Sequence, residues 1–410
     1  MTRLLCLAAV LILCCVLSAC GNNHSSTSSS GQARDPVPVG IPASGCGSIA
    51  TPPPVDTDGV LAQIGPSYAK DYAGYSTPIS AGAWRNFKPS HPPPYKIGLA
   101  FAQLTADAQV RVYAGLKKQL GGDPGIKLTA VTTGDQVNLP QQLQQFQSLL
   151  QQKPDLLIVQ PIGDAFAKPI AEAAKAGIPT ISLINTTVSP YAVNVVPNNY
   201  ANGAQAASVV LRQIQGRGNV LLVHGIAAAT VDQQRFEAYR AALKNCPGVK
   251  VVGEIAGAFA PATAKAETLK YLATHPGKVD AVLQTSGMAP GIISAFEQAG
   301  RSVPVVGDVG AMKGSLAYWR DHRNAYNGFG MGYPPNDMAT AATAVVKGML
   351  AGDGLQISDI TAPYVPVTPQ NLDQWADSGW DLNTPGIADG PGGTFMSKAF
   401  VAGLFKKNPR

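Results

Sequence analysis

The feature that most constrains this chain is a regular alternation of short apolar strands and amphipathic helices that begins at Lys96. Continuous runs of Val, Ile and Leu are typical of parallel strands buried on both faces of a sheet. Helix-period stripes separate these runs, as where Leu139, Leu143 and Phe146 share one face. Two such series in succession predict an α/β fold made of two doubly wound parallel-sheet lobes.

The predicted elements follow one another through short connections. In the first series the strands are 96–101, 127–131, 156–160 and 180–184, and the helices are 107–120, 139–152 and 165–176. In the second series the strands are 219–223, 249–255, 281–283 and 303–306, and the helices are 201–214, 231–243, 261–273 and 291–299. Gly177 ends one helix and Pro261 opens another, which are the positions that these residues favour.

The first 20 residues indicate export. A short positive start, Met1 to Arg3, leads into an apolar run at 4–17. This run is too short to cross a bilayer core of ~30 Å, which needs about 20 residues. A small-residue cleavage site follows it, as in a secretory signal peptide. Residues 1–19 are therefore predicted to be removed.

The segment Leu17-Ser18-Ala19-Cys20 resembles a bacterial lipobox. The resemblance implies that Cys20 receives a diacylglycerol, becomes the mature N-terminus and anchors the exported protein to the outer face of the cell membrane, or to its periplasmic side. An ordinary secretory signal with an unmodified cysteine is the alternative. Residues 20–95 are then a lipidated tether and a Pro/Gly-rich N-terminal extension.

The cysteine count predicts one disulfide. Three of the six cysteines lie in the discarded segment, and lipidation accounts for Cys20. Cys46 and Cys246 remain in an oxidising compartment, so we expect them to pair and to pin the N-terminal extension to the second lobe. Two free thiols are the alternative, because the sequence does not show whether the two Cα atoms approach within the ~7 Å of a disulfide.

Composition and motifs exclude several classes of function. The net charge is only +6 and no run of five basic residues occurs, so a nucleic-acid-binding face is not expected. The sequence has no P-loop, no dinucleotide-binding glycine run after a strand and no G-x-S-x-G. None of the five histidines forms a metal pair at i, i+4, and two distant cysteines supply too few metal ligands. We therefore expect no enzyme activity, metal or cofactor.

Three stretches carry a family resemblance. They are LLIVQP at 156–161 with AEAAKAGIP at 171–179, RFEAYRAAL at 235–243, and HPGKVDAV at 275–282 continuing to QAG at 298–300 and VPVVG at 303–307. In order and spacing they resemble the type I periplasmic binding proteins of the ribose-binding group, over roughly residues 95–368. The resemblance implies two lobes joined by a three-segment hinge, with a small ligand held between the lobes at the carboxyl ends of the strands.

The resemblance also divides the chain. It implies chain crossings near 197/198, 332/333 and 361/362. The first lobe is then 96–197 with 333–361, the second lobe is 198–332 with 362–370, and 371–410 is a C-terminal tail.

Two site residues match the family's pattern. Arg235 stands where the family places its second-lobe arginine, and Phe259 stands where it places its second-lobe aromatic residue. In the family, aromatic faces pack against sugar C–H groups while charged and amide groups bind the hydroxyls. Each residue has a structural alternative, which is a lobe-stabilising role for Arg235 and core packing for Phe259.

The other family positions are occupied by different residues. They are Ala108 and Gln109 for the aromatic pair after the first strand, Ile184 and Asn185 for an Asp-Arg pair, Thr285 or Ser286 for an asparagine, Asp308 and Val309 for an aspartate that is displaced or absent, and Tyr333 for a hinge glutamine. An Asp-Arg pair binds sugar hydroxyls through charge-assisted hydrogen bonds, which contribute about 1.5–3 kcal/mol each. Because this chain lacks the pair, tight ribose binding is not expected. With Phe166 added at the end of the third strand, the candidate ligand-binding residues are Gln109, Phe166, Asn185, Arg235, Phe259, Ser286, Asp308 and Tyr333.

The resemblance implies the substrate-binding component of an ABC importer. A monomer would close on a sugar, polyol or sugar derivative and deliver it to a membrane permease, whose ATPase subunit supplies the energy. A ligand-sensing protein that presents a ligand-dependent surface to a membrane receptor is the alternative, and the sequence does not separate the two. An extracellular enzyme would need a nucleophile–base pair, and a sugar-responsive transcription regulator would need a helix-turn-helix segment; the sequence offers neither.

Overall fold

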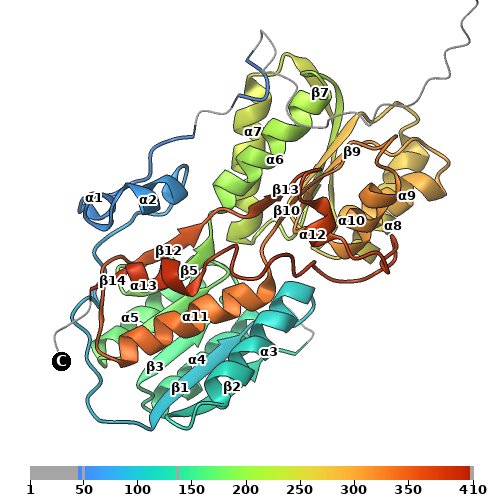
Figure 1. The fold of residues 1–410 in the computed structure, drawn as a ribbon. Helices are drawn as coiled ribbons and strands as arrows, with labels where there is room; N and C mark the ends of the chain where they lie inside the picture. The colour runs from blue at the N-terminus through green and yellow to red at the C-terminus, as the bar shows by residue number, and fades with distance from the viewer. Residues whose placement is uncertain (1–44, 49–50, 135–137, 407–410) are drawn as a thin grey trace, which may run out of the picture. The chain divides into compact units, whose positions relative to one another are not determined.

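The structure is a computed structural model that describes residues 45–48, 51–134 and 138–406 (Figure 1). The predicted signal peptide and Cys20 lie outside the described residues. Two six-stranded sheets dominate the described part, and each sheet with its helices is called a lobe here. Lobe 1 contains the first predicted series of strands and lobe 2 contains the second.

Lobe 1 is built on a sheet of strand order β12-β5-β4-β3-β1-β2, in which every pairing is parallel. Its strands are β1 (Tyr95–Phe101), β2 (Ile126–Thr132), β3 (Leu156–Val159), β4 (Thr180–Leu183), β5 (Ala192–Pro197) and β12 (Asp359–Ala362), and its helices are α3 (Asp107–Gly121), α4 (Leu139–Gln151), α5 (Ala167–Lys175) and α11 (Pro335–Leu350), with the 3-10 turn η2 (Gly163–Phe166) before α5. Ile97 and Leu99 pack in the cluster that includes α3 and α11, while Ala100 packs in the cluster of α4 and α5. The sheet is therefore covered on both faces.

Lobe 2 repeats this architecture with strand order β13-β10-β9-β8-β6-β7, and only β13 runs antiparallel to its neighbour. Its strands are β6 (Arg217–His224), β7 (Gly248–Ala256), β8 (Ala281–Gln284), β9 (Val305–Val309), β10 (Phe329–Gly332) and β13 (Val365–Val367), and its helices are α6 (Asn199–Gln213), α7 (Thr230–Lys244), α8 (Pro261–Thr274), α9 (Ala289–Gln298) and α10 (Lys313–Asp321). Val220 and Leu222 pack with the α6 and α7 cluster, while Leu221 and Val223 pack with α8 and α9.

The chain passes between the two sheets at three short connections. β5 of lobe 1 leads into α6 of lobe 2, β10 of lobe 2 leads into α11 of lobe 1, and β12 leads into β13. In both sheets the parallel strands direct their carboxyl ends to one edge, which is where open α/β sheets bind ligands.

Strand β5 was not among the strands that the sequence predicted, because Asn194 interrupts its apolar run. The buried Asn194 side chain is fully used inside the lobe. Its oxygen accepts a hydrogen bond from the Thr187 backbone N–H at 2.9 Å, and its amide donates to Thr187 O at 3.2 Å and to Asp359 Oδ1 at 2.9 Å. A polar residue is tolerated in a buried strand when all its groups are paired in this way.

The N-terminal extension is attached to lobe 1 through the buried Asp359 of β12. The extension contains α1 (Val60–Ile64), α2 (Pro66–Ala69) and the 3-10 turn η1 (Lys70–Tyr72). The Tyr72 hydroxyl donates to Asp359 O at 2.6 Å, and the Tyr75 hydroxyl donates to the Asp359 carboxylate at 2.7 Å. Burial raises the pKa of Asp359 to about 6, although hydrogen bonds from its neighbours oppose the rise.

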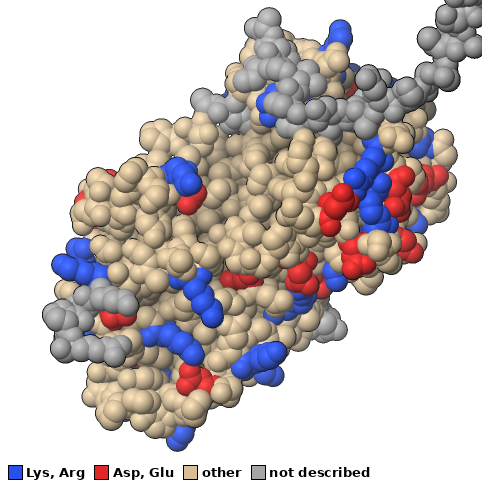
Figure 2. Space-filling view, in the orientation of Figure 1, with Lys and Arg blue, Asp and Glu red and all other residues tan. Residues whose placement is uncertain are grey.

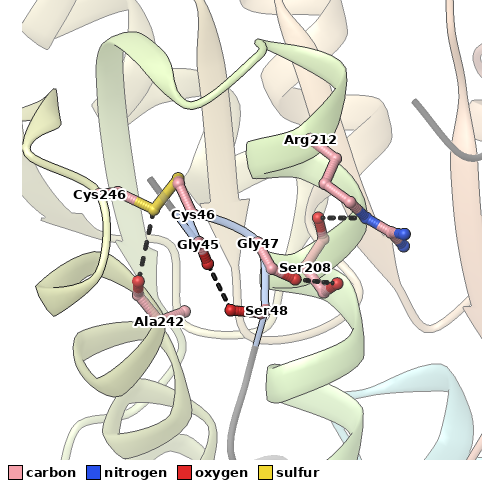
Figure 3. Close-up of a disulfide and its surroundings, with 8 residues drawn as sticks. All are labelled: Gly45, Cys46, Gly47, Ser48, Ser208, Arg212, Ala242 and Cys246. Atoms are coloured by element: carbon pink, nitrogen blue, oxygen red, sulfur yellow. Dashed lines mark hydrogen bonds between the residues drawn. A yellow bond between two sulfur atoms is a disulfide. The ribbon is translucent and has the colours of Figure 1, made fainter. Parts of the chain in front are cut away.

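The same extension is joined covalently to lobe 2. Cys46 and Cys246, the pair predicted from the cysteine count, form a disulfide with their Cα atoms 4.6 Å apart (Figure 3). Beside the bond, the Ser208 hydroxyl in α6 donates to Gly47 O at 2.6 Å. The described part of the extension therefore contacts lobe 2 at Cys46 and lobe 1 at Tyr72 and Tyr75.

The C-terminal residues are also packed against the lobes. They form α12 (Leu372–Trp375), α13 (Lys398–Gly403) and β14 (Phe405–Lys406), and β14 pairs with the short strand β11 (Gly354–Leu355). Residues 385–394, which are rich in Gly and Pro, contain no helix or strand. Over the described residues, every helix falls short of the length and apolarity that a membrane span requires.

Replacing Cys46 and Cys246 together by Ser is expected to lower the free energy of unfolding by about 2–4 kcal/mol, because the bond closes a long loop in the unfolded chain. The two cysteines are 200 residues apart in sequence. Urea unfolding of the oxidised protein measures the change, and fully reduced wild type should match the double variant. Equal stability of the oxidised wild type and the double variant would contradict this prediction.

Candidate functional site

Polar side chains follow several strands at the carboxyl edges of both sheets. In lobe 1, Gln103 comes shortly after β1 and Asn185 shortly after β4. In lobe 2, Thr285 and Ser286 follow β8 directly. Gln103, Asn185 and Thr285 are buried, and Ser286 is half-buried. Parallel strands thus bring hydrogen-bonding groups from distant parts of the sequence to the same edge of each sheet.

The centre of the lobe 2 part is Arg235, which lies on α7 and is fully buried. Its Nη1 donates to Thr285 O at 2.5 Å. Its Nη2 donates to Asn199 Oδ1 and to the Tyr364 hydroxyl, both at 3.0 Å. None of these three partners is a carboxylate, so all the hydrogen bonds to this buried positive charge come from neutral groups. Removing a charge from water is expensive unless its donors are paired, yet Nε of Arg235 has no hydrogen-bond partner.

Three aromatic rings form a cluster beside Arg235, and one of them contacts the guanidinium. The guanidinium carbon lies 5.1 Å from the centre of the Tyr364 ring, a cation–π contact. Tyr364 in turn packs against Tyr333, with ring centres 4.5 Å apart, and Phe395 contacts both tyrosines. Burial raises the pKa of Tyr333 well above its ordinary value, so its hydroxyl stays protonated. Tyr333 and Tyr364 lie in two of the connections between the lobes, which ties the arginine to the hinge.

Buried polar atoms without a hydrogen-bond partner lie on both lobes at these strand ends. They include Gln103 Oε1 and Asn185 Oδ1 on lobe 1, and Thr285 Oγ1, Arg235 Nε and Asp308 Oδ1 on lobe 2. Native proteins leave few buried polar groups unpaired, and each exception needs an explanation. Amide acceptors, a hydroxyl and a guanidinium donor form a set that suits a ligand with several hydroxyl groups.

Strained backbone marks the same edges of the sheets. Ile184, after β4, has φ of 68°, Phe259, after β7, has 57°, and Ala311, after β9, has 46°. The left-handed region is unfavourable for residues other than glycine, and most of all for a β-branched residue such as Ile184. Strain of this kind concentrates at functional sites, so these three connections add to the case for a site at the strand ends.

The structure brings Arg235 and Tyr333 into one cluster, and it places four other predicted residues near strand ends. The Asn185 amide donates to Pro161 O at 2.9 Å. Gln109 Oε1 accepts from the Ala106 backbone N–H at 3.4 Å, which caps the start of α3. The Phe259 ring lies against Gly225, where a Cβ would be 2.1 Å from the ring. Ser286, the fourth, follows the buried Thr285.

Two predicted residues lie inside the lobes instead. Phe166 is fully buried in the lobe 1 core, with its ring centre 5.6 Å from that of Phe146, because the turn before α5 faces α4. Asp308 is buried in lobe 2, where its carboxylate accepts from the Met312 backbone N–H and the Ser315 hydroxyl at the start of α10. Asp308 also borders a cavity of about 10 Å³. In this structure the two side chains have packing and helix-capping roles.

Sequence reasoning missed three residues of this arrangement. Tyr364 and Asn199 hold Arg235, and Gln103 supplies a buried acceptor on lobe 1. The only sequence signal for Gln103 is a polar residue close after an apolar strand. Asn199 follows Asn198, which caps α6 by accepting a hydrogen bond from the Ala201 N–H.

Taken together, these features define a class of protein: a two-lobed α/β binding protein with its polar groups at the strand ends of both lobes. The chain belongs to the periplasmic binding protein family, because the family model described as "Periplasmic binding protein domain" matches residues 97–354. That family consists of solute-binding proteins rather than enzymes. Among the described residues, no three His, Cys, Asp or Glu side chains are placed to hold a metal ion.

Comparisons with individual proteins agree with this assignment. A xylitol-binding protein of Mycolicibacterium smegmatis is 28% identical over 170 residues, which are 40% of this chain and 49% of that protein. The match thus spans about half the length of the relative. An ABC transporter solute-binding protein of Thermobispora bispora has a TM-score of 0.63 and 25% identity, over 71% of this chain and 91% of that one. A solute-binding protein of Bacillus halodurans with bound myo-inositol has a TM-score of 0.62 and 19% identity, over 69% and 98% of the two chains, and shares the fold.

The buried Asp308 carboxyl predicts a pH dependence of stability. Burial raises its pKa to about 7 from an ordinary 3.8, although hydrogen bonds from Ser315 and Met312 oppose the rise. Between these pH values the unfolded chain loses the proton while the folded protein keeps it. The free energy of unfolding should therefore fall as pH rises from about 4 to 7.

Asp308→Asn should remove this contribution. One pKa unit corresponds to about 1.4 kcal/mol, so between pH 4 and 7 the wild type should lose roughly 3 to 4 kcal/mol more than the variant. Urea unfolding at several pH values measures the difference. Asp381→Asn, at an exposed aspartate, is the control and should keep the wild-type slope. Parallel curves for wild type and Asp308→Asn would show that the buried carboxyl does not titrate as described.

Proposed function

We propose that this protein is the substrate-binding component of an ABC importer and that its cargo is a neutral molecule with several hydroxyl groups, such as a sugar, polyol or sugar derivative. The observation that carries the proposal is the set of unpaired buried groups at the strand ends. Gln103 and Asn185 offer acceptors from lobe 1, while Arg235 and Thr285 offer a donor and a hydroxyl from lobe 2. The names of two relatives, one binding xylitol and one holding myo-inositol, support the same ligand class.

Arg235 and the amide oxygens of lobe 1 together favour a neutral ligand over an anionic one. An anionic ligand would be attracted to this guanidinium, but the lobe 1 groups that face the ligand in our proposal are amide oxygens, which repel anions. A neutral polyol satisfies both sides, because each hydroxyl donates one hydrogen bond and accepts others. The charged side chains on the face shown in Figure 2 are scattered and of both signs, with no continuous basic area.

In this proposal ligand contacts to both lobes drive closure. A ligand that binds Arg235 on one lobe and Asn185 on the other stabilises the closed state more than the open state, and this difference is what shifts the population. The closed protein, a monomer, then presents its surface to a membrane permease, and a separate ATPase subunit supplies the energy. The sensing alternative shares the binding step and differs in what the closed protein contacts.

A thermal-shift screen against sugars, polyols, nucleosides and amino acids tests the ligand class. A ligand at ~100 Kd adds about 2.7 kcal/mol of stability, which raises the melting temperature measurably. We expect responses from neutral polyhydroxylated compounds, with xylitol and myo-inositol included in the panel. Responses only from amino acids or nucleosides would contradict the proposed cargo, and loss of uptake of the bound compound after deletion of the protein would separate import from sensing.

Variants on α7 link binding to the site. Arg235→Ala should weaken the affinity for the compound found by the screen more than tenfold, since a buried charged contact is worth over about 1.4 kcal/mol. Arg240→Ala removes an exposed arginine of the same helix and should leave the affinity unchanged. Calorimetric titration measures both, after melting curves show that the variants fold. A change under threefold for Arg235→Ala would place the ligand elsewhere.

We also propose that the protein is exported and anchored by a lipid on Cys20. The support is the lipobox-like segment before Cys20, together with a family whose members act outside the cytoplasm. Cys20→Ala should release the protein from the membrane fraction into the soluble or secreted fraction. Fractionation followed by immunoblotting measures this, and a variant that stays with the membrane would contradict lipid anchoring.

A further inference from the structure

The C-terminal residues pass from lobe 2 to lobe 1 outside the three hinge connections. After β13, Trp375 of α12 is buried in the core of lobe 2. Further on, α13 packs against α11 of lobe 1, and β14 pairs with β11. Figure 1 shows this red stretch of ribbon leaving α12 and running to α13. Residues 386–396, between these two anchorages, are called the strap here.

One residue of the strap is held by both lobes at once. Ile387 pairs in antiparallel fashion with Met312 of lobe 2, flanked by hydrogen bonds that join Gly386 O to the Lys313 N–H and the Ala388 N–H to Ala311 O, both at 2.9 Å. The backbone N–H of Ile387 also donates to Asp107 Oδ2 of lobe 1 at 2.9 Å, and its carbonyl accepts from Arg111 Nη1 at 3.0 Å. The backbone N–H and the carbonyl of Ile387 are thus both hydrogen-bonded to side chains of lobe 1.

Two further contacts hold the strap on lobe 1. Arg111 forms an ion pair with Asp389, whose side chain is 56% exposed. The backbone N–H groups of Thr394 and Phe395 lie 3.1 and 3.5 Å from Asp337 Oδ2 at the start of α11. Phe395 then packs on the tyrosines that support Arg235. The strap therefore begins on lobe 2 and is bound by Asp107 and Arg111 of lobe 1. It ends at Phe395, which contacts the tyrosines of the candidate site.

The strap joins the two connections that border the candidate site. On lobe 2 it pairs with the residues between β9 and α10, and on lobe 1 it is bound by the first two turns of α3. These segments follow strand ends, so separating the lobes at the site requires the strap to leave one of them. The contacts that would break on the lobe 1 side are two hydrogen bonds and an exposed ion pair. Such contacts are individually weak and sensitive to salt.

We propose that the strap is a fourth connection between the lobes, which restrains their opening and thereby slows ligand release. Its lobe 1 contacts at Asp107 and Arg111 act as a latch, while its lobe 2 contacts stay in place. The restraint on opening stands on the contacts alone, and the effect on ligand release rests on the function proposed above.

The double variant Asp107→Ala/Arg111→Ala removes the latch and leaves the lobe 2 pairing. A matched control is Arg323→Ala/Asp373→Ala, which removes an exposed ion pair inside lobe 2 that also involves the first turn of a helix. Small-angle X-ray scattering of the full-length exported protein without ligand reports the separation of the lobes. We expect a larger radius of gyration for the latch variant than for wild type, and no change for the control. High salt should move the wild type toward the latch variant.

Ligand release is measured by stopped-flow dissociation of xylitol, where we expect the latch variant to be at least threefold faster than wild type and control. An unchanged radius of gyration in the latch variant overturns the proposal, whatever the ligand. If xylitol does not bind but the radius grows, the restraint on opening is supported, and the release rate is then measured with the compound that the thermal-shift screen finds. If the double variant does not fold, Arg111→Ala alone replaces it, because this change removes both the ion pair with Asp389 and the hydrogen bond to Ile387 O. Its control is Arg323→Ala, and an unchanged radius for Arg111→Ala also overturns the proposal.

Discussion

A buried guanidinium whose three partners are all neutral must be stabilised by oriented dipoles, and the fold supplies these around Arg235 from three separate elements. The carbonyl of Thr285 comes from the end of β8, the amide oxygen of Asn199 from the start of α6, and the hydroxyl of Tyr364 from the connection between β12 and β13. Asn199 directly follows the first connection between the lobes, and Tyr364 lies within the third. The position of the Arg235 guanidinium therefore depends on the geometry of the hinge. A change in the arrangement of the lobes would move the partners of Arg235 and so alter the candidate ligand-binding site.

The fold was predictable because its strands are apolar on both faces, and a run such as 156–160 has few other stable placements than a covered parallel sheet. Arg235 was selected from the resemblance, and its role in ligand binding stays a prediction. Residues that act through long-range contacts were not: nothing near Tyr364 in the sequence indicates an arginine on α7. Asp308 and Phe166 show a second limit. A strand end fixes where a residue lies along the sheet, but the side on which the side chain lies depends on the packing, which turned both side chains into the lobes.

Both terminal extensions hold the lobes partly through their backbone groups, and these contacts need no periodic sequence pattern. On the N-terminal side the Asn198 amide donates to the carbonyls of Asp71 and Ala73, and on the C-terminal side Ile387 uses both its N–H and its carbonyl. Such contacts need particular backbone paths rather than particular side chains. Pro/Gly-rich segments supply these paths without an apolar stripe, so the extensions resemble loops in sequence while acting as braces in the structure.

If Cys20 carries the proposed lipid anchor, the Cys46–Cys246 bond also sets the length of chain between the membrane and the folded lobes. From Cys20, the covalent path reaches the body after about 26 residues, which span at most roughly 90 Å. Without the bond, the first covalent attachment to a lobe would be at β1, some 75 residues from Cys20, and the permitted distance would be nearly three times as great. The disulfide attaches this segment to lobe 2. Reduction of the Cys46–Cys246 bond would therefore change both the greatest distance between the lobes and the proposed anchor at Cys20, and the lobe that lies nearer to that anchor.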